Sequence, residues 1–184
     1  TFGVIGAGQM GSGIAQVAAM SGLDVIMNDI KTEFVEKGFE GISKIMSRSV
    51  DKGKMSEDDK SAILGRIKTS VSLADMASAD YVVEAATENE DIKYQIFKGL
   101  DEICNEAVIL ATNTSSIPIG RIAAQTRRPE KVIGMHFMNP VPVMKLVEVI
   151  PGIATSEETF QITWKLAEKF GKTPAKAEDY PGFI

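Results

Sequence analysis

The feature that most constrains this chain is a glycine pattern placed between an apolar strand and a helix. Three glycines spaced as G-x-G-x-x-G occupy the segment Gly6, Ala7, Gly8, Gln9, Met10 and Gly11, directly after the strand-like residues 1–5 and ahead of a helical pattern over 10–20. The first glycine permits a tight turn, the second lets the backbone approach a pyrophosphate, and the third lets the helix pack closely on the strand. Unpaired N–H groups and the helix dipole favour an anion there. The sequence therefore predicts a bound dinucleotide.

An acidic residue at the end of the next predicted strand indicates which dinucleotide binds. Asp29 follows Gly11 by eighteen residues and ends the apolar run 24–29. A carboxylate at this position accepts hydrogen bonds from the adenine ribose and repels a 2′-phosphate, which predicts NAD rather than NADP. Lys31 would offset part of that repulsion. A solvated aspartate would explain Asp29 alone, and a glycine-rich turn without a ligand would explain the glycines alone. Neither alternative explains both signals well.

Composition limits the class of protein. The 184 residues are enough for one domain with a substantial core, and a hydrophobic share of 44% is ordinary for a soluble globular protein. The net charge of −5 argues against nucleic acid as a main partner, and no apolar run approaches the length of a membrane span. The single cysteine, Cys104, rules out an intrachain disulfide, and no Cys/His spacing predicts a metal site. We expect a cytoplasmic location, although Thr1 already lies in the first predicted strand, which leaves a preceding targeting segment open.

Alternating strand and helix patterns predict the architecture. A long apolar stripe predicts a helix over 32–52 that stops at Gly53, and Ser56 with Asp59 forms a capping-box pattern for a second helix through Leu64. These two successive helices indicate an insertion that projects from the sheet. Further strands are predicted at 66–70, 81–84, 108–111, 132–135, 145–150 and 173–177, and further helices at 89–104, near 118 and at 157–170. The fold class is α/β: a Rossmann-type, mostly parallel sheet with an inserted helical hairpin and, because 136–144 is too short for a crossover, antiparallel edge strands at the C-terminal end.

The only histidine and a carboxylate in an apolar strand form a candidate catalytic pair. His136 directly follows the apolar strand 132–135 at the sheet edge where ligands bind in open α/β folds. Imidazole suits the role of a general base because its usual pKa lies near neutral pH. Glu148 falls where the period-two pattern of 145–150 requires an apolar residue, and a buried carboxylate needs a partner. We therefore expect Glu148 to orient His136; the alternatives are a histidine satisfied by backbone and an edge strand on which Glu148 faces water.

A run of hydroxyl side chains follows the strand 108–111 and lies on the same sheet edge as the glycine loop. Its residues are Thr112, Asn113, Thr114, Ser115 and Ser116. A hydroxyl there can bind a substrate oxygen, and Ser115 is the candidate. The alternative is purely structural, with Ser116 capping the helix that begins near Pro118. Both interpretations can hold at once.

Together these motifs resemble the L-3-hydroxyacyl-CoA dehydrogenase family, nearest to its bacterial members that act on 3-hydroxybutyryl-CoA. The resemblance covers the whole chain through G-A-G-Q-M-G-S-G-I-A-Q at 6–16, V-E-A-A-T-E-N at 83–89, T-N-T-S-S at 112–116, G-M-H-F-M-N-P at 134–140, K-L-V-E-V-I at 145–150 and P-G-F at 181–183. It implies that His136 is the general base, Glu148 its partner, and Ser115 a contact of the substrate hydroxyl or keto oxygen. The implied NAD-binding set is Gly6, Gly8, Gln9, Met10, Gly11, Asp29, Glu88, Lys93, Asn113, Ser115 and Asn139.

The resemblance also implies what the predicted helical hairpin binds. In the family this hairpin contacts the coenzyme A portion of the substrate. Arg48 and Lys52 fall one turn apart on its first helix and suit phosphate groups. Spacing alone favours a solvated basic face almost as strongly, so only the resemblance assigns these two residues to substrate binding.

The resemblance implies NAD-dependent interconversion of (S)-3-hydroxybutyryl-CoA and acetoacetyl-CoA. In the family a catalytic asparagine and a helical domain, which supplies the dimer interface, follow the Pro-Gly-Phe motif, whereas this sequence stops at Ile184. We therefore expect residues 1–184 to form an NAD-binding domain that binds NADH but turns over poorly alone. Two alternatives remain: a dehydrogenase of a free hydroxy acid or sugar acid, and a dinucleotide-binding module without catalysis.

Overall fold

Eight strands form one sheet in the computed structural model, which describes residues 1–180. Their order is β3-β2-β1-β4-β5-β6-β7-β8. The strands are β1 Phe2–Ile5, β2 Val25–Asn28, β3 Ile67–Ser70, β4 Tyr81–Glu84, β5 Ile109–Thr112, β6 Val132–Phe137, β7 Leu146–Pro151 and β8 Thr173–Lys176. β1 to β6 pair in parallel, β7 pairs antiparallel with β6, and β8 pairs in parallel with β7. The predicted Rossmann-type sheet with reversed strands at its C-terminal end is confirmed.

Helices cover both faces of this sheet. They are α1 Gln9–Met20, α2 Thr32–Asp51, α3 Glu57–Leu64, α4 Glu90–Ile103, α5 Ile119–Ala123 and α6 Glu157–Lys169, with short 3-10 helices η1 Leu73–Ser78 and η2 Pro129–Lys131. One buried apolar cluster includes side chains of α1, α2 and α6, and a second includes side chains of η1, α4 and α5. The central strands β1, β4 and β5 are buried along their whole length, as expected for parallel strands covered on both faces.

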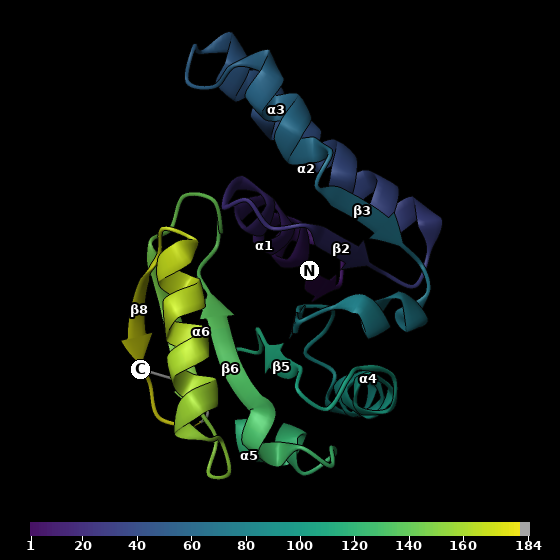
Figure 1. Cartoon of the computed structure of the whole chain (residues 1–184), viewed down its shortest axis with the longest axis vertical. Helices are drawn as coiled ribbons and strands as arrows, with labels where there is room; N and C mark the ends of the chain where they lie inside the picture. Colours follow the sequence, from purple (N-terminus) through teal and green to yellow (C-terminus); the bar gives the residue numbers. More distant parts are fainter. Residues whose placement is uncertain (181–184) are drawn as a thin grey trace.

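The inserted helices α2 and α3 extend away from the sheet, at the top of Figure 1. Gly53 has a φ of +65° after the last turn of α2, the left-handed stop that the sequence predicted. Ser56 caps α3 by accepting a hydrogen bond from the Asp59 N–H at 3.0 Å. Its hydroxyl in turn donates to the Asp59 carboxylate at 2.6 Å. The predicted hairpin is therefore present, and it packs against α1 and β3.

His136 lies within a strand rather than directly after one. The sequence predicted that the strand ends at residue 135, but β6 continues to Phe137 because β7 pairs with it in antiparallel register. In that register His136 is directly opposite Glu148. The extension depends on a neighbouring strand and therefore has no signal in the local sequence.

A buried lysine, Lys172, holds the loop between β6 and β7 in place. The ammonium group of Lys172 donates hydrogen bonds to the carbonyl oxygens of Val141 and of Met144, the latter at 2.8 Å. Burial lowers the pKa of Lys172, and the nearby charge of Lys145 lowers it further. These contacts anchor the segment that leads from β6 to β7.

Ser116 does not cap α5, contrary to the structural interpretation of this serine. The N-terminus of α5 has no cap from its own neighbourhood, and the carboxylate of Asp179 accepts from the N–H groups of Ile119 and Gly120 at 2.6 and 2.9 Å. A side chain some sixty positions further along the chain thus accepts from the free N–H groups in the first turn of α5.

The predicted Pro-Gly-Phe motif at 181–183 lies outside the described residues.

A buried ion pair joins the end of α4 to the segment before η2. Asp101 accepts hydrogen bonds from Arg127 Nε at 3.0 Å and from Arg128 Nε at 2.7 Å. Burial raises the pKa of Asp101, but hydrogen bonds from the backbone and side chain of Arg127 and from Arg128 outweigh it, so that this pKa lies below its usual value. The stability that Asp101 supplies is therefore present above the ordinary aspartate pKa of 3.8 and is lost as pH falls through the lowered folded-state pKa.

Replacing Asp101 by asparagine should lower the free energy of unfolding by about 3 kcal/mol at pH 7, because the Arg128 guanidinium stays buried without its counter-charge. Urea unfolding at pH 7 and pH 3 measures the effect, and the difference from wild type should shrink at the acid pH. Glu102→Gln, at an exposed neighbouring position of α4, is the matched control and should change stability by less than about 0.5 kcal/mol. A loss for Asp101→Asn as small as that of the control would contradict this role.

Candidate active site

Two cavities with shared walls lie at the carboxyl edge of the parallel strands. The larger, of about 830 Å³, is lined by the glycine loop and by residues of β2, α2 and α4. The smaller, of about 380 Å³, is lined by residues of the loops after β4 and β5 and of the end of β6. Ala86 and Thr87 line both. This is the position, between β1 and β4 where the strand order reverses, at which open α/β sheets bind ligands.

The glycine loop has the close contacts that its sequence pattern requires. Gly6 adopts a φ of +99°, and a Cβ atom on Gly11 would lie 1.8 Å from the carbonyl oxygen of Gly6. Gly8, by contrast, has no heavy atom within 4 Å of where its Cβ would be, so its backbone is open to a ligand. Gly8 is also the N-cap of α1, and no side chain caps the N–H groups of that helix. An anionic pyrophosphate fits this helix terminus.

Asp29 lines the larger cavity and is also bound to the glycine loop. Its Oδ2 accepts from the Ala7 N–H at 2.7 Å, and its Oδ1 accepts from the Ile30 N–H at 2.7 Å. Lys31 is the cation expected to offset the charge of Asp29. Its Nζ lies 3.5 Å from the Glu33 carboxylate and 5.4 Å from the centroid of the Phe34 ring. The carboxylate of Asp29 therefore faces the cavity where a ribose would lie, and Glu33 offsets part of the Lys31 charge.

The catalytic candidates form a continuous chain of hydrogen bonds. Nδ1 of His136 lies 2.7 Å from Oε2 of Glu148, and Nε2 of His136 lies 3.1 Å from the hydroxyl oxygen of Ser115. The side chain of Glu148 is 11% exposed, so the alternative in which it faces water is wrong. Ser115 and His136 both line the smaller cavity, with Glu148 behind the imidazole. This arrangement holds the Nε2 edge of the imidazole toward the cavity.

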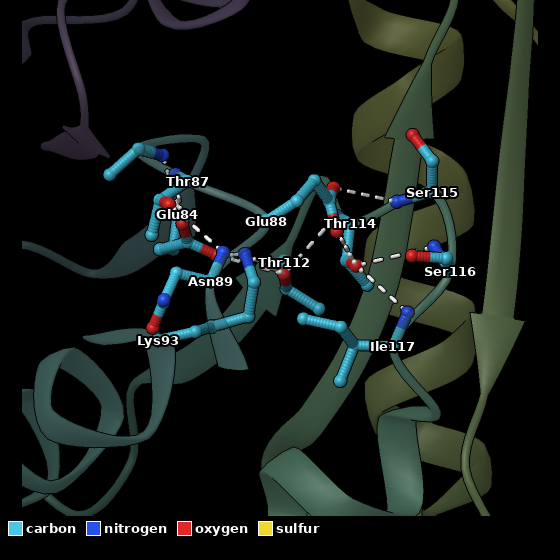
Figure 2. Close-up of polar contacts among 11 residues, drawn as sticks. Glu84, Thr87, Glu88, Asn89, Lys93, Thr112, Thr114, Ser115, Ser116 and Ile117 are labelled. Atoms are coloured by element: carbon cyan, nitrogen blue, oxygen red, sulfur yellow. Dashed lines mark hydrogen bonds and ion pairs between the residues drawn. The ribbon is translucent and has the colours of Figure 1, made fainter. Parts of the chain in front are cut away.

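Glu88 fixes the loop that carries Ser115. Its two carboxylate oxygens accept from the hydroxyl of Thr114 at 2.7 Å and from the N–H of Ser115 at 2.9 Å (Figure 2). The Thr114 hydroxyl oxygen also accepts from the N–H of Ile117 at 3.1 Å. Glu88, predicted as a cofactor contact, lines the smaller cavity and orients the serine as well.

The remaining predicted cofactor residues also lie in or beside the two cavities. Gln9, from the glycine loop, donates to the side-chain oxygen of Asn139 at 3.1 Å, and Met10 and Asn139 line the smaller cavity. Asn113 lines it too, but its Oδ1 accepts from the Phe137 N–H at 2.8 Å, which ties the loop after β5 to the end of β6. No local pattern around Asn113 predicts this structural role.

A buried carboxylate beneath the cavities was not among the predicted site residues. Glu84, the last residue of β4, forms an ion pair with Lys93, and both side chains are almost completely buried. Lys93, one of the predicted cofactor residues, lines the smaller cavity. The available signal was an acidic residue that ends the otherwise apolar strand Tyr81–Glu84.

Arg48 and Lys52 are not brought to either cavity. Both are exposed, at the last turn of α2 and at its C-cap, and neither lines the cavities. They lie on the projecting hairpin of Figure 1. Their assignment to substrate binding stays a prediction.

Within residues 1–180, no three or more His, Cys, Asp or Glu side chains gather as metal ligands would. Among the helices of the same residues, none combines the length and the hydropathy needed to cross a membrane.

Comparisons with known proteins agree with this geometry. Residues 1–180 match the family model described as 3-hydroxyacyl-CoA dehydrogenase, NAD binding domain. A probable 3-hydroxybutyryl-CoA dehydrogenase of Deinococcus radiodurans is 54% identical over 183 residues, which are 100% of this chain and 66% of that protein. One from Bacillus subtilis is 54% identical over 98% of this chain and 63% of its own length. The crystal structure of (S)-3-hydroxybutyryl-CoA dehydrogenase PaaH1 from Ralstonia eutropha superposes with a TM-score of 0.98 and 48% identity, over 100% of this chain and 65% of that one.

The fold and the two cavities define a Rossmann-type dinucleotide-binding protein. The chain belongs to the 3-hydroxyacyl-CoA dehydrogenase family, through its NAD-binding domain. The predicted resemblance is thereby confirmed, and the cofactor is NAD. The chain spans about two thirds of the length of the curated relatives it matches.

NADPH should bind at least about tenfold more weakly than NADH, because Asp29 repels a 2′-phosphate at the wall of the larger cavity. Titration with each reduced cofactor, followed by fluorescence, measures the two dissociation constants. Lys31→Ala should widen the preference, since Lys31 is the cation that offsets Asp29. Equal or tighter binding of NADPH would contradict the assignment of Asp29.

Proposed function

We propose that the whole protein interconverts (S)-3-hydroxybutyryl-CoA and acetoacetyl-CoA with NAD as the redox cofactor. The observation that carries this proposal is the hydrogen-bonded line of Ser115, His136 and Glu148 at the smaller cavity. The names of the relatives from Deinococcus radiodurans and Ralstonia eutropha support the substrate.

The residues of the larger cavity would hold the adenosine and pyrophosphate of NAD, with Asp29 at the ribose and the N-terminus of α1 at the phosphates. Glu88, Lys93 and Asn139 would hold the nicotinamide end at the smaller cavity. The cofactor, when bound, accepts or donates the hydride, and the protein supplies position and proton transfer.

His136 would take the hydroxyl proton of the hydroxyacyl substrate at Nε2, and return it to the keto oxygen in the reverse reaction. The Glu148 carboxylate at Nδ1 fixes the ring orientation and stabilises the imidazolium that this transfer creates. The Ser115 hydroxyl, 3.1 Å from Nε2, would hydrogen-bond the same substrate oxygen and direct it toward the imidazole. His136 alone would move the proton, while Glu148 and Ser115 would position the imidazole and the substrate oxygen.

The coenzyme A portion of the substrate would contact the α2–α3 hairpin, with Arg48 and Lys52 at its phosphates. Two exposed cations near the end of one helix suit a polyanion. We assign residues 1–184 to one NAD-binding domain. A further helical domain, in a longer chain, would supply a catalytic asparagine and the interface of a homo-oligomer. We further propose a cytoplasmic location.

His136→Ala should lower turnover of acetoacetyl-CoA by at least about a thousandfold, while NADH binding stays within about twofold of wild type. The reason is that the contacts with adenosine and pyrophosphate lie in the larger cavity, which His136 does not line. Stopped-flow NADH oxidation in the chain extended through the helical domain measures the rate, and fluorescence titration measures binding. Wild-type turnover by this variant would show that His136 is not the general base.

The extended protein should oxidise NADH with acetoacetyl-CoA at least about a hundredfold faster than with free acetoacetate, because the hairpin recognises coenzyme A. In the same assay, the 184-residue chain should bind NADH but reduce acetoacetyl-CoA more slowly than the extended protein does. Assaying both proteins with both substrates separates the alternatives. Turnover of the free acid at an equal rate would indicate a hydroxy-acid dehydrogenase, and NADH binding without any turnover would indicate a non-catalytic module.

A further inference from the structure

A buried acidic side chain lies under the junction of the two cavities and takes no part in the proton transfer described above. Glu84 ends β4 and has no exposed surface. Its Oε1 accepts from the N–H groups of Ala86 at 2.8 Å and Thr87 at 3.4 Å, and its Oε2 accepts from the Thr112 hydroxyl at 2.9 Å and from the Lys93 ammonium (Figure 2). These four groups are all hydrogen-bond donors to the carboxylate.

The partners of Glu84 are the walls of the site. Ala86 and Thr87 line both cavities, and Lys93 lines the smaller one. Thr112 is the end of β5, directly before the loop that carries Ser115. One carboxylate thus holds the backbone between the cavities, the cation beneath the smaller cavity, and the start of the serine loop in fixed relative positions.

Charge explains why this residue is a glutamate. Lys93 is 1% exposed, and an isolated ammonium group in such a position is strongly disfavoured. The Glu84 carboxylate neutralises it, so the pair presents almost no net charge to the smaller cavity. The nicotinamide ring is positively charged when oxidised and neutral when reduced. A change in the charge beneath the smaller cavity would therefore act on the two redox forms unequally.

We propose that Glu84 is a positioning residue of the NAD site, which fixes Lys93 and the Ala86–Thr87 backbone and, by neutralising Lys93, sets the relative affinity for oxidised and reduced cofactor. This proposal rests on the proposed function, in which the nicotinamide end lies at the smaller cavity. Glu84 acts through its neighbours, since it lines neither cavity itself.

The test is the ratio of the dissociation constants of NAD⁺ and NADH in Glu84→Gln. The amide keeps the size of the side chain but removes its charge, so the Lys93 ammonium loses its counter-charge. We expect the ratio Kd(NAD⁺)/Kd(NADH) to rise more than twofold. A ratio within twofold of wild type would overturn the proposal.

Two further variants separate charge from stability. Asp101→Asn removes a similarly buried, ion-paired carboxylate that lines neither cavity, and it should leave the ratio within twofold even though it destabilises the fold. Lys93→Met leaves the Glu84 carboxylate without its counter-charge, so the ratio should fall more than twofold. If Glu84→Gln does not fold, Lys93→Met decides the question, and an unchanged ratio then overturns the proposal.

The outcomes also separate this inference from the proposed function. A shifted ratio in a protein that does not turn over acetoacetyl-CoA would make the proposed substrate wrong and leave the role of Glu84 intact. An unchanged ratio in a protein that reduces acetoacetyl-CoA would remove the role of Glu84 alone.

Discussion

The antiparallel pairing of β6 with β7 is the constraint on which the site depends. Its register sets His136 directly opposite Glu148, so the 2.7 Å contact between imidazole and carboxylate follows from the sheet itself. A shift of one residue would turn the glutamate to the other face of β7 and leave the imidazole without its acidic partner. The rigid ladder thus supplies the orientation of the proposed proton-transferring group, and the short connection between β6 and β7 makes the reversal of direction necessary.

Acidic side chains fix the rest of the site in the same way, by binding backbone or buried donors next to the cavities. Asp29 accepts from the glycine loop, Glu88 accepts from the serine loop, and Glu84 accepts from the loop after β4. Each carboxylate thus fixes the position of a loop and also places negative charge where the dinucleotide and substrate are expected. Loops at the carboxyl edge carry the chemistry, while the parallel strands behind them supply a rigid base.

Much of the fold follows from local sequence patterns. The glycine loop, the two inserted helices and the alternation of strand and helix are each encoded within a few residues of where they occur, so their prediction succeeded. Glu148 was detectable because a carboxylate breaks the two-residue period of an apolar strand. The prediction of the family from the sequence used six motifs, and five of them lie wholly within the part of the chain that the structure describes.

The features that sequence could not provide depend on contacts between distant segments. Asp179 caps α5, and Asn113 binds the Phe137 N–H, across separations of sixty and twenty-four residues. The inclusion of His136 in β6 depends on a partner strand, and the four donors around Glu84 come from three different segments. Burial and pairing of this kind are properties of the folded chain, and no window of neighbouring residues specifies them.

The tautomer of His136 tests the central claim most directly, and it is accessible because this is the only histidine in the sequence. Nitrogen-15 NMR of the imidazole, recorded at a pH where the ring is neutral, distinguishes a proton on Nδ1 from one on Nε2. A base oriented by Glu148 requires the proton on Nδ1 and an Nε2 lone pair directed toward Ser115 and the cavity. A ring protonated on Nε2 instead would contradict the arrangement, since its lone pair would then face the carboxylate.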